Sequence, residues 1–208
     1  MSKNSSRVPA AALLTLALLA GGCDRQDSAA GQAKATAKTQ STDTTTTTTT
    51  TEKVVIDKIG ILDRSHKGEA APTARFTMPD GSATSLAAFA GKPVLLNLWA
   101  TWCGPCVAEM PTLDRVALDD AGLQVVTVSQ DLQGASSVQP YFAKGGLKAI
   151  KPYLDPTNAM LTALQTSGAE ISLPTSILYD STGHEVWRMV GGMDWTTPTA
   201  KGLLAEGR

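Results

Sequence analysis

The chain of 208 residues has few of the residues that carry metal or nucleic-acid chemistry. It contains three cysteines and two histidines, and its formal net charge is -1. Because no basic stripe is present, a nucleic-acid partner is not expected. The histidines, His66 and His184, lack ligand-like spacing to each other or to a cysteine pair, which disfavours a zinc site. The sequence therefore predicts no metal and no cofactor.

Long apolar runs are also missing. The longest, Ala10 to Ala20, has about half of the ~20 residues that a membrane-spanning helix needs. Lys3 and Arg7 precede this run and two glycines follow it, a pattern typical of a targeting segment that is removed. We therefore interpret residues 1–22 as a signal peptide.

The segment from Ala20 to Cys23 resembles the lipobox of bacterial lipoproteins. The resemblance implies that Cys23 is acylated and anchors the mature chain to a membrane. Asp24 is similar to the second-position aspartate that retains enterobacterial lipoproteins in the inner membrane, so we expect an inner-membrane protein that faces the periplasm. Simple secretion, with Cys23 lost or idle, is the alternative.

Residues 23–68 read as a flexible linker. They contain few large apolar side chains before Val54, and Thr44 to Thr51 is an unbroken threonine run. Such a segment cannot bury enough apolar surface to offset the entropy of ordering it. Two short apolar stretches, at 54–56 and 59–62, could form a strand or a docking segment, and the sequence leaves both open.

From residue 69 to residue 208 the apolar pattern is dense, and it predicts one α/β domain. Val94 to Trp99 has the length and composition of a central strand covered on both faces. A helix with Pro111 inside it follows, and then a second apolar strand, which implies a parallel crossover. The other predicted elements are a hairpin at 74–86, an inserted helix at 131–146, a short strand at 151–155, a helix at 158–165, a hairpin at 176–190 and a closing helix at 196–204.

Cys103 and Cys106 have the spacing of a reversible dithiol/disulfide pair. Cys103 falls where a strand gives way to a helix, so helix N–H groups and the helix dipole should favour its thiolate. We therefore expect Cys103 to be the nucleophile and Cys106, one helical turn later, to resolve the mixed disulfide. Gly104 leaves room for an incoming disulfide, and Pro105 suits the first turn of a helix. A permanent structural disulfide is the alternative.

Three motifs in combination resemble the TlpA/ResA-type membrane-tethered thioredoxins. They are the run from Asn97 to Cys106, the Glu109-Met110-Pro111 triplet, and Leu173-Pro174-Thr175. The resemblance implies a thioredoxin-like fold: a central mixed β-sheet flanked by helices, with an N-terminal β-hairpin extension and a helical insertion. It also implies a thiol:disulfide oxidoreductase.

The same resemblance assigns roles to several residues. Glu109 would tune thiol protonation, with a solvated surface glutamate as the alternative. Leu173, Pro174 and Thr175 would form a cis-proline loop that faces the cysteine pair and binds an incoming peptide. Asn97 replaces the buried aspartate of ordinary thioredoxins and is interpreted as a satisfied core residue.

The four tryptophans are expected to differ in role. Trp102 abuts Cys103 and is expected to form an exposed wall for the partner, with a core position as the alternative. Trp99, within the predicted central strand, is interpreted as core. Trp187 and Trp195 are interpreted as packing residues.

We expect an enzyme that acts mainly as a reductant of particular protein disulfides, although the residues themselves do not fix the direction of electron flow. The family resemblance suggests apocytochrome c or the copper-site cysteines of respiratory oxidase assembly as substrates, and a membrane electron donor of the DsbD or CcdA type. Two other functions stay open. One is a thiol peroxidase on a related fold, and the other is a delivery protein whose two thiols hold Cu(I).

Overall fold

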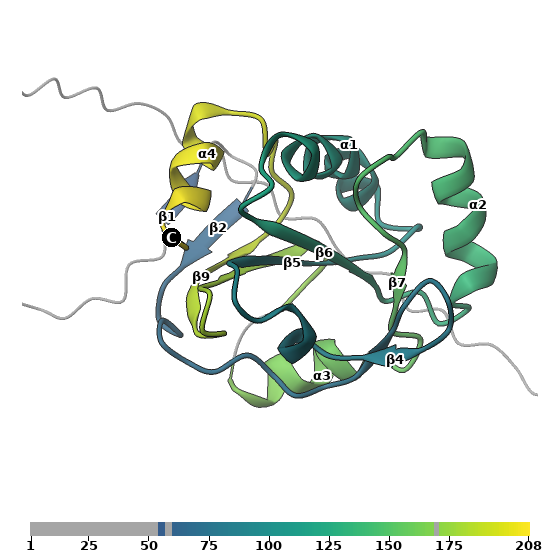
Figure 1. Ribbon diagram of the computed structural model, residues 1–208, viewed down its shortest axis with the longest axis horizontal. Coiled ribbons are helices and arrows are strands. Elements are labelled where there is room, and N and C mark those ends of the chain that lie inside the picture. Colours follow the sequence, from purple (N-terminus) through teal and green to yellow (C-terminus); the bar gives the residue numbers. More distant parts are fainter. Residues whose placement is uncertain (1–53, 57–59, 169–170) are drawn as a thin grey trace, which may run out of the picture. The chain divides into compact units, whose positions relative to one another are not determined.

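The computed structural model describes residues 54–56, 60–168 and 171–208. The predicted signal peptide, Cys23 and the threonine run lie outside these residues. No helix in the described ranges is long and apolar enough to cross a membrane. Figure 1 shows a sheet with helices on both of its faces.

The described strands form one mixed sheet in the order β1-β2-β9-β8-β5-β6-β7-β3-β4. Strands β5 and β6 are parallel, as are β6 and β7, and the remaining pairs are antiparallel. The strands are β1 (Val54–Ile56), β2 (Gly60–Asp63), β3 (Phe76–Thr77), β4 (Ala83–Thr84), β5 (Val94–Trp99), β6 (Gln124–Ser129), β7 (Tyr153–Leu154), β8 (Thr175–Tyr179) and β9 (Glu185–Val190).

Two apolar layers cover the sheet. Helices α1 (Gly104–Asp119), α2 (Ala135–Gly145) and α4 (Pro198–Ala205) pack on one face, and α3 (Ala159–Thr166) and the 3-10 helix η1 (Leu86–Phe89) pack on the other. Every residue of β5 is buried, as predicted for a central strand. Since side chains alternate along a strand, Leu95 and Trp99 enter the layer under α1, whereas Leu96 and Leu98 enter the layer of α3.

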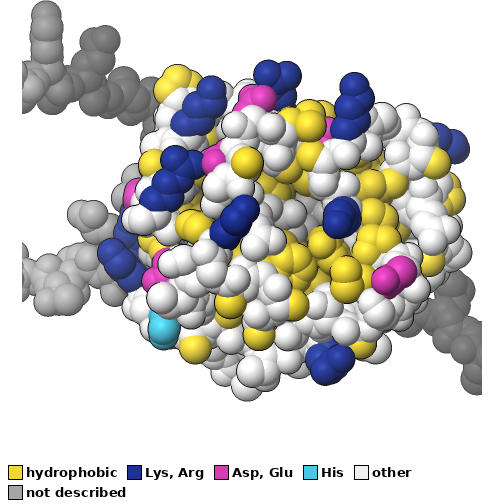
Figure 2. Space-filling model, viewed as in Figure 1, with side chains coloured by type: hydrophobic (Ala, Val, Ile, Leu, Met, Phe, Trp, Pro, Cys, Tyr) yellow, Lys and Arg dark blue, Asp and Glu magenta, His cyan; other side chains and the backbone are white. Residues whose placement is uncertain are grey.

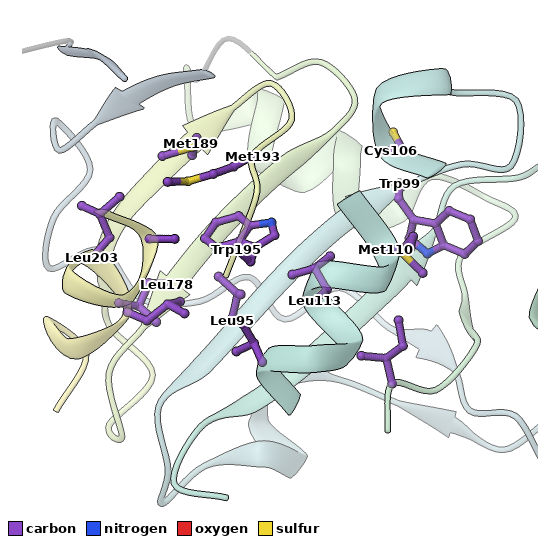
Figure 3. Packing of buried hydrophobic residues seen from close by; sticks show 14 of the residues in the cluster. Leu95, Trp99, Cys106, Met110, Leu113, Leu178, Met189, Met193, Trp195 and Leu203 are labelled. Atoms are coloured by element: carbon purple, nitrogen blue, oxygen red, sulfur yellow. The ribbon is translucent and has the colours of Figure 1, made fainter. Parts of the chain in front are cut away.

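The layer under α1 is rich in large side chains (Figure 3). Trp99 is fully buried there, which confirms its core assignment. Its ring centroid lies 5.1 Å from that of Tyr141 and 6.0 Å from that of Phe142, both on α2. These contacts dock the inserted helix against the end of β5, where the cysteine motif begins.

The predicted elements match the observed ones closely, with differences at the N-terminal side. The predicted hairpin at 74–86 is shorter, because only Phe76–Thr77 pairs with Ala83–Thr84 and the chain then turns into η1. Strand β2 pairs with β9, so residues 60–63 form a strand rather than a docking segment. The boundary placed at residue 69 is therefore too late, because backbone pairing extends the sheet into the predicted linker.

Buried carboxylates fix two connections that hydrophobic patterning does not explain. Asp114 on α1 accepts hydrogen bonds from the backbone N–H groups of Lys148, Ala149 and Ile150. Asp155 accepts from the N–H groups of Ala159 and Met160 at the start of α3. Both carboxylates thus bind backbone N–H groups, one set in a loop and one at a helix start, and the donors of Ile150 and Met160 are buried.

The charges on the face seen in Figure 2 are dispersed. Lys and Arg side chains stand apart from one another among uncharged and apolar ones. No continuous basic surface is visible on this face.

Candidate active site

Cys103 is the N-cap residue of α1. Its backbone is extended, and its sulfur accepts a hydrogen bond from the N–H of Cys106 at 3.3 Å. Gly104 and Pro105 begin the first turn of the helix. Pro105 has no backbone N–H, and the helix loses no hydrogen bond because N–H groups of the first turn have no partner within the helix. The positive end of the helix therefore faces the sulfur of Cys103, an arrangement that favours a thiolate.

The two cysteines form a disulfide and differ in exposure. Cys103 retains 6% of its surface, and Cys106 retains none. Trp102 beside them is 72% exposed, as expected for a wall that a partner could contact. Because only Cys103 meets solvent, an external disulfide would be attacked by Cys103 and the product resolved by Cys106.

The peptide bond between Leu173 and Pro174 is cis, as the family resemblance implies. The loop leads directly into β8, whose Thr175 lies in register with Leu98 of β5 and Val190 of β9. The Pro174 carbonyl accepts a hydrogen bond from the N–H of Gly191 at 2.8 Å. The loop is thus held between strands, and Leu173, partly buried, packs on both apolar layers.

Glu109 is buried at 3% exposure, which is incompatible with a solvated surface glutamate. Its Oε1 accepts from Asn97 Nδ2 at 2.7 Å, and its Oε2 accepts from Met193 N at 3.0 Å and Trp195 Nε1 at 3.3 Å. Burial raises the pKa of Glu109 to about 7, against the opposite effect of these three hydrogen bonds. The carboxyl group therefore exchanges a proton near neutral pH.

Asn97 is not the satisfied core residue that we inferred from the sequence. Its Nδ2 donates to Glu109 and to Ser176 Oγ, but its Oδ1 has no hydrogen-bond partner although it is buried. An amide carries donors at one end and an acceptor at the other, so rotation by half a turn would present Oδ1 to a protonated Glu109. Asn97 can thus hydrogen-bond to both protonation states of the carboxyl group.

A cavity of about 280 Å³ is lined by Glu109 and by Pro105 of the cysteine motif. Pro105 and Ala108 line it on the helix side, and Met193 and Asp194 line it on the loop after β9. Glu109 follows Cys106 by three residues, so both lie on one side of α1. A larger cavity of about 690 Å³ lies between the C-terminal part of α1 and α4, and no residue of the motif lines it.

Three residues that hydrogen-bond to Glu109 or to the cysteine motif were not identified from the sequence. Trp195, interpreted as a packing residue, also donates to Glu109, and Met193 contributes a backbone N–H. Asp131 accepts from both the N–H and the hydroxyl of Thr101, two residues before Cys103. All three lie far from the motif along the chain, and the only signal, a weak one, was for Asp131, which comes two residues after the end of a predicted strand.

The histidines lie apart from this site. His66 pairs with Glu69 and His184 with Thr182. Among the described residues, no group of three or more His, Cys, Asp or Glu side chains is placed to hold a metal ion.

The site is thioredoxin-like. A strand ends at a redox cysteine pair, a helix starts there, and a cis-proline loop is present. The chain belongs to the Redoxin family, whose model matches residues 66–204. The matched residues begin in the segment before β3 and end within α4.

Individual relatives agree with this assignment. The chain is 30% identical to the thiol-disulfide oxidoreductase ResA of Bacillus thuringiensis over 126 residues, covering 60% of this chain and 69% of ResA. It is 32% identical to the thioredoxin-like protein YneN of Bacillus subtilis, covering 56% of this chain and 67% of YneN. The protein is thus a thioredoxin-like thiol:disulfide oxidoreductase that acts on protein thiols and disulfides.

Solved structures support the same fold. A DsbE-type thiol:disulfide interchange protein from Chlorobium tepidum superposes with a TM-score of 0.57 at 26% identity, covering 68% of this chain and 98% of that one. The pneumococcal exposed lipoprotein thioredoxin of Streptococcus pneumoniae superposes with a TM-score of 0.52 at 26% identity, covering 64% of this chain and 97% of that one.

Proposed function

We propose that the protein works as a reductant of specific protein disulfides on the periplasmic side of the inner membrane. The observation that carries the proposal is the buried carboxyl group of Glu109, which lies one helical turn after Cys106 and whose pKa is raised by burial to about 7. A reductant must deprotonate its second thiol in every cycle, and a carboxyl group titrating near neutral pH suits that task.

The cycle begins with the reduced pair. The thiolate of Cys103 attacks one sulfur of the partner disulfide, forms a mixed disulfide and releases the first partner thiolate. Cys106 then passes its proton to the Glu109 carboxylate and attacks the sulfur of Cys103. This step forms the Cys103–Cys106 disulfide and releases the second partner thiolate, so two electrons pass to the partner.

The released thiolates take up protons, one of them from Glu109 through the cavity beside it. The oxidised pair is reset by a membrane dithiol donor of the DsbD or CcdA type, which becomes a disulfide in turn. Such a donor is required because the periplasm is oxidising and does not supply thiols.

Two substrate classes fit this direction of electron flow. One is the heme-binding cysteine pair of apocytochrome c, and the other is the cysteine pair of a copper site in respiratory oxidase assembly. Both must be in the dithiol form before they accept heme or copper. The support is the likeness to ResA, named a thiol-disulfide oxidoreductase, and the DsbE-type structural relative.

A lipid anchor on Cys23 would hold the domain near its donor. The lipobox-like sequence before Cys23 and the lipoprotein thioredoxin among the structural relatives support this anchor. Residues between Cys23 and β1 would then act as the tether.

Partner trapping tests the proposal. A Cys106→Ala variant cannot resolve the mixed disulfide, so it should accumulate covalent partners in the periplasm, among them apocytochrome c or a copper-site protein. The matched control carries Cys103→Ala as well and should trap nothing. Thiol-reversible adducts that appear equally in the control would contradict the proposed nucleophile.

The reduction potential of the pair tests the direction. A reductant should have a potential close to that of thioredoxin, about -270 mV. A value near that of DsbA, about -120 mV, would reverse the assigned electron flow.

A further inference from the structure

Two large apolar side chains stand out on the surface beside the cysteine pair. Trp102 and Leu132 are each 72% exposed, more than any other large hydrophobic residue that the structure describes. Trp102 precedes the nucleophile Cys103, whereas Leu132 lies thirty residues further along the chain. Exposure of this kind costs solvation free energy, so a pair of such residues next to a reactive group points to a binding surface.

The sheet register brings the segments of these two residues side by side. Strands β5 and β6 are parallel, and Trp99 is the register partner of Ser129. Trp102 and Leu132 each lie three residues beyond this pair. Because paired strands are about 4.8 Å apart, the two segments leave the sheet side by side.

Asp131 ties the two segments together. Its Oδ2 accepts from the backbone N–H of Thr101 at 2.9 Å, and its Oδ1 accepts from the Thr101 hydroxyl at 2.6 Å. The hydroxyl of Ser129 donates to the same carboxylate at 2.7 Å. Asp131 is itself buried, so these bonds fix the backbone just before both Trp102 and Leu132.

Three segments around the cysteine pair contain no charged residue. Residues 98–108, 132–143 and 171–179 contain no Asp, Glu, Lys or Arg. These are the motif itself, the segment of Leu132 with most of α2, and the cis-proline loop with β8. Of the nearby carboxylates, Glu109 and Asp131 are buried, and the exposed Asp194 lines the cavity beside Pro105. A partner that lies on these three segments is therefore selected by apolar contact rather than by charge pairing.

We propose that Leu132 and Trp102 form one docking surface for an apolar side chain that flanks the disulfide cysteine of the partner protein. The occupant is an extended segment of the partner, because exchange at Cys103 requires the partner backbone to lie against the motif. Leu132 is the specificity-determining residue of this surface, and Asp131 is its positioning residue. This inference rests on the proposed function and names the substrate class of the same site.

Two cyclic peptides with one internal disulfide test the inference. They differ only in the residue beside each cysteine, which is leucine in one and serine in the other. The reduced wild-type protein should reduce the leucine peptide with a kcat/KM about tenfold higher, since one partly buried leucine side chain accounts for a factor of this size. Leu132→Ser should lower this preference to about twofold.

Leu118→Ser is the matched control. Leu118 is also exposed, at 52%, but it lies near the far end of α1, roughly 20 Å from the cysteine pair. This variant should keep the tenfold preference. The preference of the wild-type protein should also stay constant between about 0.05 and 0.5 M salt, since apolar contacts are not screened.

Asp131→Asn tests the positioning role. An asparagine offers one carboxamide oxygen where the carboxylate offers two, so the hold on Thr101 weakens. The preference for the leucine peptide should fall, and adding Leu132→Ser to this variant should lower it little further. Equal and independent losses from the two substitutions would show that Asp131 does not act through Leu132.

The outcomes separate this inference from the proposed function. Exchange with hydroxyethyl disulfide reports the cysteine pair without any docking surface. If the reduced wild-type protein fails to exchange with it, the proposed function is overturned and this inference with it. If exchange occurs but Leu132→Ser retains the full preference for the leucine peptide, this inference alone is overturned.

Discussion

Two glutamates of this protein are buried to the same extent, and their partners differ. Glu109 on α1 and Glu185 on β9 are both 3% exposed. Glu109 accepts hydrogen bonds only from neutral groups, namely an amide, a backbone N–H and an indole. Glu185 forms two hydrogen bonds with the guanidinium of Arg188, from Nε at 2.6 Å and from Nη2 at 2.5 Å.

The difference decides what each carboxyl group can do. Burial raises the pKa of both groups, and at Glu185 the hydrogen bond and charge of Arg188 act in the opposite direction. The guanidinium of Arg188 favours the charged form of the Glu185 carboxyl group, and its two hydrogen bonds fix the position of that group. At Glu109 the donors are neutral and a cavity lies beside the carboxyl group, so this group can bind and release a proton near pH 7. We therefore interpret the pair of Glu185 and Arg188 as structural, whereas Glu109 has the burial and the pKa that the proposed proton transfer requires.

The largest expected effect is on the ion pair. Arg188→Met leaves the Glu185 carboxyl buried without its cation and should lower the free energy of unfolding by about 4 kcal/mol. Urea unfolding at pH 7 measures this loss. The double variant Arg188→Met, Glu185→Leu is the control and should recover most of the stability, because no charge is left buried. A double variant as unstable as the single one would contradict the pairing argument.

The second effect concerns stability and pH at Glu109. Because its pKa rises from 4.5 to about 7 on folding, the folded state binds the proton more tightly than the unfolded state. The resulting stabilisation is complete below pH 4.5 and is lost as the pH rises through 7, by about 3 kcal/mol in total. Glu109→Gln should remove this slope, so its stability relative to the wild type should improve between pH 5 and 8.

Urea unfolding of the oxidised protein across this pH range tests the second effect. The change should persist at high salt, because its cause is burial rather than surface charge. Parallel stability curves for the wild type and Glu109→Gln would show that Glu109 does not titrate in this range.

The third effect is on the reaction. Glu109→Gln removes the proton acceptor for Cys106 and should slow reduction of a peptide disulfide about a hundredfold. The pH dependence of the rate should also lose its inflection near 7. Glu206→Gln, on a surface glutamate that pairs with Arg64, is the control and should leave the rate unchanged. A retained inflection in Glu109→Gln would assign the proton transfer to another group.

The smallest effect comes from the indole of Trp195. Trp195→Phe removes the 3.3 Å hydrogen bond to Oε2 of Glu109. Since that bond stabilises the carboxylate, the inflection should move upward by less than about one pH unit. Trp187→Phe is the matched control, because its indole N–H donates to the Leu203 carbonyl instead. A shift of equal size in both variants would point to packing of the stacked rings rather than to the hydrogen bond.

Much of the fold follows from local pattern. The apolar run of β5, the helix after Cys103 and the β8–β9 hairpin were all predicted, because strand and helix periods are written in neighbouring residues. The sequence did not predict whether residues 60–63 form a strand, since a short apolar segment becomes a strand only if it pairs with the edge of another strand. Strand β9 provides that edge.

The candidate site divides in the same way. The roles expected of Cys103, Cys106 and Pro174 depend on motifs a few residues long. The partners of Glu109 could not be found in this way, because Met193 and Trp195 are more than eighty residues away in the chain. The orphaned Oδ1 of Asn97 also became visible only with the packed interior.

The sequence alone determined where a redox cysteine pair sits, on which strand end and at which helix start, because those features are set by residues in direct succession. Only the tertiary structure decided which carboxyl group is free to carry a proton and which is locked in an ion pair. The same holds for the proposed role of Leu132, because the parallel pairing of β5 and β6 and the hydrogen bonds from Thr101 to Asp131 bring its segment beside that of the cysteine motif. Burial and partner identity are properties of the packed chain, and no local pattern encodes them.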